Sequence, residues 1–198
     1  FWYEWVGEWF MELSSLNGRI IGVISDDFKE YDYQDKLVKD LITKKVDASF
    51  KMVKLDNSVL NEKFSDLPLG DKNKVILANQ LHNQEIILVN FSKGLIKKDL
   101  DYFKSLFKKI ANYGKKIILV EKRMDLFLNC VDRIYVINED EIKYETIDIF
   151  DKTLGLYADY PKIVEFYFKG IDLGVRLDQY TELDELLKAI YRIKSWDI

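Results

Sequence analysis

The chain is poor in the residues that build metal sites and disulfides, with one cysteine, one histidine and two prolines among 198 residues. Its lone Cys130 cannot close a disulfide within the chain, which fits a reducing compartment. One histidine and one cysteine cannot supply a structural zinc site, so we predict no metal site. No apolar run reaches the roughly 20 residues of a membrane-spanning helix, so we predict no insertion into a membrane.

Charge of one sign is not in excess either. The formal net charge is -4, from 30 basic and 34 acidic side chains. Such a balance gives no electrostatic case for binding nucleic acid or an anionic membrane surface. The hydrophobic share of 48% and the charged share of 32% are typical of a globular domain and exclude a disordered chain.

The first residues, FWYEWVGEWF, are dense in aromatic side chains and lack an initiator methionine. They also lack the basic start and clean apolar run of a signal peptide. We interpret residues 1–18 as an N-terminal segment that is either trimmed or part of a longer protein. Large aromatic side chains favour core packing. The alternative is a partner-binding surface, because such residues are enriched at interfaces; it would use Trp2, Trp5 and Trp9.

From residue 19 onward, short apolar runs alternate with helical patterns. Such alternation indicates parallel strands that are buried on both faces by helices. Strands are predicted over 19–24, 85–89 and 116–120, helical segments over 33–45, 50–55, 71–82, 98–113 and 124–130, and a hairpin over 133–137 and 141–145. Beyond it the pattern is helical, and Pro161 is placed to start a helix.

The predicted fold is therefore α/β: a mainly parallel sheet with flanking helices, an antiparallel edge hairpin and a helical C-terminal extension. We divide the chain into the N-terminal segment (1–18), a core (19–145) and the extension (146–198).

Several stretches, in order, resemble the ATPases of ABC transporters. LPLGDKNKVILANQLHNQEIILVNFSKGL is similar to the family's run from signature motif to Walker B, and KKIILVEKRMDLFLNCVDRIYVINEDEIKYE to its switch-histidine region. IIGVISDDFKEYDYQDKLVKDL resembles the Q-loop segment of the energy-coupling-factor importers, and the residues after 146 resemble their C-terminal extension. The resemblance covers most of 19–190 and implies a reduced P-loop-NTPase-like fold that lacks the phosphate loop.

The positions that bind nucleotide in the family are replaced here. No stretch matches the phosphate-binding GxxxxGK loop. The Q-loop glutamine falls on Asp26. In the signature motif the serine falls on Pro68 and the first glycine on Leu69, and only Gly70 is kept. Proline removes a backbone donor, and leucine blocks close approach of the backbone to a phosphate.

The catalytic positions are replaced as well. The Walker B aspartate falls on Asn90, and the glutamate that activates water falls on Phe91, whose ring can neither accept a proton nor orient water. The aspartate of the next loop falls on Ile96, and the switch histidine falls on Lys122. The resemblance therefore implies a protein that is not an enzyme, binds no nucleotide and needs no cofactor.

Three aromatic residues, Phe28, Tyr31 and Tyr33, stand where the family's Q-loop region contacts the coupling helix of a membrane subunit. They could form a partner-binding surface. They could equally cover the core that a missing helical subdomain once covered.

We expect a non-catalytic accessory or pseudo-ATPase subunit of an energy-coupling-factor-type transporter that acts through protein contacts. Its partner would be a membrane subunit, an ATPase homologue or a second copy. It would lie in the cytoplasm, free or peripheral at the inner face of the membrane. The alternatives are an interaction or regulatory module unrelated to transport and a nucleotide sensor without hydrolysis.

Overall fold

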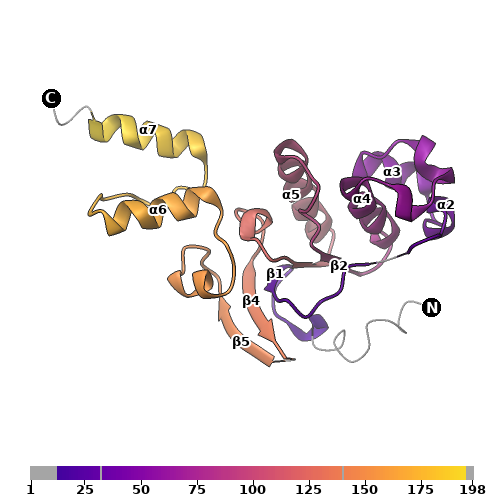
Figure 1. Ribbon diagram of the computed structural model, residues 1–198, viewed down its shortest axis with the longest axis horizontal. Coiled ribbons are helices and arrows are strands. Elements are labelled where there is room, and N and C mark those ends of the chain that lie inside the picture. Colours follow the sequence, from indigo (N-terminus) through magenta and orange to yellow (C-terminus); the bar gives the residue numbers. More distant parts are fainter. Residues whose placement is uncertain (1–12, 32, 140, 195–198) are drawn as a thin grey trace.

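A computed structural model describes residues 13–31, 33–139 and 141–194 (Figure 1). The predicted interface residues Trp2, Trp5 and Trp9 lie outside these ranges. The predicted α/β class is confirmed by a single five-stranded sheet with the order β2-β3-β1-β4-β5. Four strands are parallel, and the fifth pairs antiparallel at one edge. They are β1 (Ile20–Ile24), β2 (Glu85–Val89), β3 (Lys116–Val120), β4 (Arg133–Asn138) and β5 (Glu141–Thr146).

The first strand lies at the centre of the sheet. Its Gly22 is paired with Leu119 on one side and with Ile134 on the other. All five β1 residues are buried, as their continuous apolar sequence requires. Gly22 leaves room for a neighbouring ring, because a Cβ there would lie 2.9 Å from Phe127. The strand is thus fixed by both its neighbours and the layer above it.

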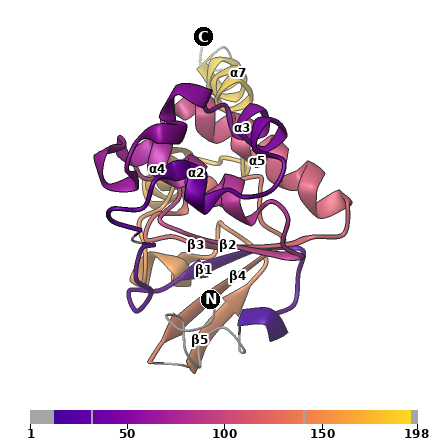
Figure 2. The same ribbon diagram turned by 90° about the vertical axis from the view of Figure 1, so that its right-hand side faces the viewer.

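The helices gather on one face of the sheet (Figures 1 and 2). The long helices α4 (Leu69–Gln80) and α5 (Lys97–Asn112) pack on the strands through buried side chains such as Val75 and Phe107. The α5 helix ends before Gly114, which has a φ of 86° as expected for the glycine that follows a helix. On the opposite face, Leu13 and Leu16 cover a second apolar cluster.

Three helix predictions need correction. The helix predicted over 33–45 is reduced to the single turn α2 (Val38–Leu41), because Leu37 is extended and bridges to Lys63. The helix predicted over 50–55 is α3 (Val46–Val53), which begins and ends earlier, between two left-handed lysines. The predicted helix over 124–130 contains only the short 3-10 turn η3 (Met124–Leu126). Two more 3-10 turns, η1 (Asn57–Asn61) and η2 (Phe64–Asp66), lead into α4.

The hairpin and the helical extension follow the prediction. Strands β4 and β5 pair from Asn138 opposite Glu141 outward, with one irregularity after Val136. A 3-10 turn η4 (Lys152–Leu156) leads to α6 (Lys162–Asp172), which begins after Pro161, and then to α7 (Leu183–Lys194). In Figure 1, α6 and α7 lie beyond β5, far from α2 and α3. None of the described helices is long and apolar enough to cross a bilayer.

The outer edge of β2 is closed by a side chain. The buried amide of Gln80 accepts a hydrogen bond from the Ile87 N–H and donates one to the Ile87 carbonyl, both at 2.8 Å. The Tyr31 hydroxyl donates a further hydrogen bond to the same carbonyl, at 3.0 Å. Gln80 therefore satisfies the backbone as a neighbouring strand would.

Replacing Gln80 by leucine should destabilise the fold by about 1–3 kcal/mol, because the buried Ile87 N–H would lose its partner. Denaturant unfolding of Gln80→Leu measures the loss. The matched control is Gln84→Leu, whose exposed amide donates to the Gly114 carbonyl; it should stay within about 0.5 kcal/mol of wild type. Equal stability of the two variants would contradict the role of Gln80.

Candidate functional site

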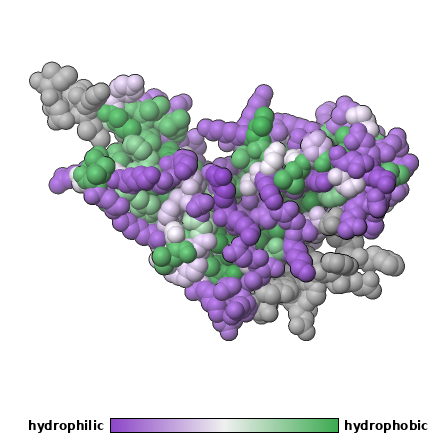
Figure 3. All heavy atoms as spheres, viewed as in Figure 1, coloured by the Kyte–Doolittle hydropathy of each residue, from purple (hydrophilic) through white to green (hydrophobic). Residues whose placement is uncertain are grey.

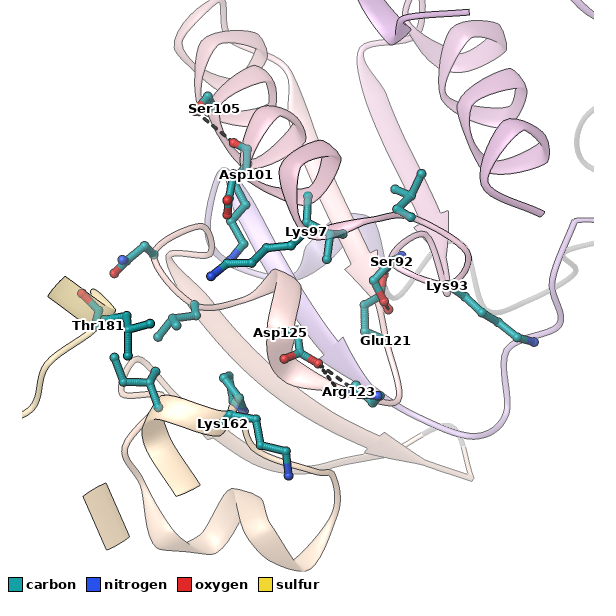
Figure 4. A pocket seen from close by; sticks show the side chains of 18 of the residues that line it. Ser92, Lys93, Lys97, Asp101, Ser105, Glu121, Arg123, Asp125, Lys162 and Thr181 are labelled. Atoms are coloured by element: carbon teal, nitrogen blue, oxygen red, sulfur yellow. Dashed lines mark hydrogen bonds and ion pairs between the residues drawn. The ribbon is translucent and has the colours of Figure 1, made fainter. Parts of the chain in front are cut away.

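The carboxyl ends of the parallel strands meet at one edge of the sheet, the usual place for a ligand in an open α/β fold. An open cavity of about 1460 Å³ lies here (Figure 4). Its walls are the loops that follow β2 and β3, one face of α5, and the beginnings of α6 and α7. Among the described residues, no three Asp, Glu, His or Cys side chains are grouped to hold a metal ion.

The loop after β2 (residues 90–96) is fastened from the helix layer. The buried amide of Asn73 on α4 donates to the carbonyls of Asn90, Phe91 and Lys93, at 3.3, 3.0 and 2.8 Å. The loop turns through left-handed Asn90, with a φ of 50°. The Asn73 amide therefore fixes the conformation of the loop after β2, since it binds three carbonyls of that loop.

The main buried ionisable group of the cavity is Glu121, directly after β3. It is 2% exposed, and its carboxylate accepts hydrogen bonds from the Ser92 N–H at 2.9 Å and from the Ser92 hydroxyl at 2.5 Å. Burial raises the pKa of Glu121 to about 7, although these hydrogen bonds act in the opposite direction. Glu121 was not among the site residues predicted from the sequence. A charged side chain placed directly after the apolar run KIILV was the available signal.

Segment 25–31, which follows β1 and is here named the edge segment, crosses the same edge. Its Asp26 lies 2.6 Å from the ammonium of Lys122, and its Glu30 lies 3.2 Å from that of Lys93. The Asn90 amide also donates to Glu30, at 2.9 Å. These charges are largely exposed, so each ion pair contributes little to stability.

The structure therefore brings together two of the replaced positions. Asp26, at the Q-loop position, pairs with Lys122, at the switch-histidine position. Lys122 and Asn90 line the cavity, and Asp26 is joined to it through Lys122. The side chain of Asp26 also raises the pKa of Lys122, through a hydrogen bond and its charge.

The other residues that the resemblance aligns with nucleotide-binding positions lie in the core or at the start of a helix. Phe91 is 1% exposed and packs edge-to-face on Phe103 and Phe107, with ring centroids 5.0 and 5.5 Å apart. Pro68 precedes the first residue of α4, which is Leu69. Ile96 precedes α5 and is largely exposed.

Gly70 has a packing role of its own. A Cβ at this position would lie 2.6 Å from the carbonyl oxygen of Gly94, in the loop after β2. Such contact is too close for any other residue without movement of the backbone. Gly70, which the resemblance aligns with the signature motif, is thus required by the contact between α4 and this loop.

All three predicted partner-binding aromatics pack on buried apolar clusters. Tyr31 contacts both apolar clusters, and Tyr33 lies edge-to-face on Phe64 at 5.2 Å. Burial raises the pKa of Tyr33 to about 12. Phe28 is half-buried against the second cluster. This arrangement matches the alternative in which these aromatics cover the core.

Neutralising Glu121 should remove a pH dependence of stability. Because the folded pKa of Glu121 lies above its ordinary value of 4.5, the folded state holds this proton more tightly. Its contribution is therefore complete below about pH 4.5 and is lost as the pH rises to about 7. Thermal or denaturant unfolding should show Glu121→Gln near wild-type stability at pH 5, but more stable by about 2–3 kcal/mol at pH 8.

The control for this prediction is Glu85→Gln. It changes a half-buried carboxyl at the first residue of β2, at the other edge of the sheet from Glu121. Because this variant keeps Glu121, its stability should still change between pH 5 and pH 8 as in wild type. A stability difference between Glu121→Gln and wild type that does not change with pH would contradict the shifted pKa.

No model of a known protein family matches the chain. In sequence it is similar to two proteins named energy-coupling factor transporter ATP-binding protein EcfA2. The first, from Mycoplasma capricolum, is 28% identical over 142 residues, which cover 66% of this chain and 49% of that protein. The second, from Mesoplasma florum, is 24% identical over 201 residues, which cover 89% and 64%. The chain thus spans between half and two thirds of the length of these curated relatives.

In structure the chain is similar to an ATP-binding subunit of an ABC transporter. The TM-score is 0.51 at 13% identity, over 76% of this chain and 69% of that chain. This likeness bears on the fold alone and agrees with the mainly parallel sheet and its helices. Sequence and fold together confirm the resemblance to the ABC transporter ATPases, with energy-coupling-factor ATP-binding proteins as relatives.

Proposed function

We propose that this chain is a transporter-associated, ABC ATPase-like protein that acts through protein contacts and does not hydrolyse ATP. The observation that carries the proposal is the burial of Phe91. By the resemblance this residue stands where the family has the glutamate that activates water. Here its ring is part of the core, against Phe103 and Phe107. A carboxylate cannot replace it without placing a charge in an apolar environment.

The ion pair between Lys122 and Asp26 supports the same proposal. A lysine ammonium at the switch position has no acceptor nitrogen, so it cannot take the role of a histidine. Its partner Asp26 holds it across the carboxyl edge of the sheet. These two side chains pair with each other at the edge of the sheet where such folds bind ligands.

A partner surface is available on the C-terminal extension. Figure 3 shows hydrophobic side chains gathered over α6 and α7. Contiguous exposed apolar surface of this kind marks an interaction site. The exposed residues include Leu156, Leu173, Leu183, Leu187 and Tyr191. Because the similar relatives are named as transporter ATP-binding proteins, we place a transporter membrane subunit or an ATPase homologue on this surface.

The full-length protein should neither release phosphate from Mg-ATP nor unfold at a higher temperature in millimolar Mg-ATP or Mg-ADP. A ligand at one hundred times its dissociation constant would stabilise the fold by about 2.7 kcal/mol and raise the melting temperature by a few degrees. An ATP-binding relative measured alongside serves as the positive control. A shift without phosphate release would favour the nucleotide sensor, and phosphate release would contradict the proposal outright.

Transporter components should co-purify with the tagged full-length protein from its native source. Recovery should fall at least several-fold for Leu187→Asp combined with Tyr191→Asp, because charges would then lie in the apolar surface of α7. Tyr113→Asp is the matched control, since Tyr113 is exposed at the end of α5. Recovery of partners unrelated to transport would instead support the interaction-module alternative.

A further inference from the structure

The buried carboxylate of Glu121 joins two loops at the floor of the cavity. Its backbone N–H donates to the Val23 carbonyl at 2.9 Å, so the residue is fixed to the central strand. Its side chain receives the Ser92 N–H and hydroxyl, so it also holds the loop after β2. The backbone of Phe91 also lies near enough to act on the pKa of this carboxyl. Glu121 is thus tied both to the central strand and to the loop after β2.

Glu121 has no counter-ion within the described part of the chain. Among the described residues, no ion pair includes Glu121, although basic side chains line the same cavity. Three of them are turned to other carboxylates: Lys93 to Glu30, Lys122 to Asp26 and Arg123 to Asp125. The remaining charged residues of the cavity wall are Lys97, Asp101, Lys104, Lys108, Lys162, Glu182 and Asp184. Asp125 adds repulsion toward a negative charge on Glu121.

We propose that Glu121 is a proton-operated latch that closes the loop after β2 when it is protonated and releases this loop when it is ionised. A neutral carboxyl fits a buried, hydrogen-bonded position. An ionised one places an unpaired charge there, and the charge gains solvation only if the loop opens to water.

The loop that would open is the wall of the cavity next to α5. In Figure 4, Ser92 and Glu121 lie together on the side of the cavity opposite Thr181, with Lys97 between. Opening would break the two hydrogen bonds of Ser92 and expose the cavity floor, while Asn73 still holds the neighbouring carbonyls. Protonation would therefore control access to the carboxyl edge of the sheet. The latch does not depend on whether the full-length protein binds nucleotide.

Amide hydrogen exchange of the full chain, measured by NMR and corrected for intrinsic rates, tests the latch. The opening equilibrium of the Ser92 amide should rise on the order of fiftyfold between pH 5 and pH 7.5 in the wild-type protein, as a carboxyl with a pKa of about 7 closed and 4.5 open requires. In Glu121→Gln it should stay constant with pH.

The amide of Ile118, fully buried in β3, is the reference for global unfolding. Ser92 should exchange faster than Ile118. Equal rates with equal pH dependence would mean that the whole fold opens, which overturns the latch. A pH-independent Ser92 amide would overturn it as well. The ¹³C shift of the Glu121 carboxyl in the wild-type protein provides a readout that needs no variant: titration near its ordinary pKa of 4.5 would also refute the proposal.

Discussion

The position of β1 between β3 and β4 is the constraint on which the rest of the structure depends. A strand with parallel neighbours on both sides has all its backbone groups paired within the sheet, so it can be buried on both faces. It holds Glu121 and Asp132 at its two ends, since the Glu121 N–H donates to the Val23 carbonyl and Asp132 accepts from the N–H groups at the start of β1. It also starts the edge segment at the centre of the carboxyl edge.

The edge segment occupies the carboxyl edge of the sheet. In open α/β proteins the carboxyl edge is held for ligands. Here side chains of the chain itself bind one another across it, through Asp26, Glu30 and Tyr31. Each exposed ion pair is weak. The partly buried Tyr31 is a stronger anchor, because it packs against both apolar clusters and its hydroxyl donates to a backbone carbonyl.

Most of the fold could be predicted from the sequence, because it follows from periodicity. The runs IIGVI, EIILV and KIILV are short, apolar and rich in β-branched residues, and all three are strands. The α5 helix has a regular apolar stripe and was predicted to within one residue at each end. The helix predicted over 33–45 was wrong for most of its length. The apolar spacing of Leu37 and Leu41 suits a helix and an extended chain alike, and Leu37 is extended and bridges to Lys63.

What the sequence determined by itself is the identity of the elements and the chemistry that is absent at particular positions. A phenyl ring at Phe91 cannot act as a base wherever it lies. Only the tertiary structure decided that this ring belongs to the core, that Asp26 and Lys122 meet, and that Glu121 is the buried acid of the cavity. Burial and pairing depend on which distant segments cross one another, and local sequence does not encode those distances.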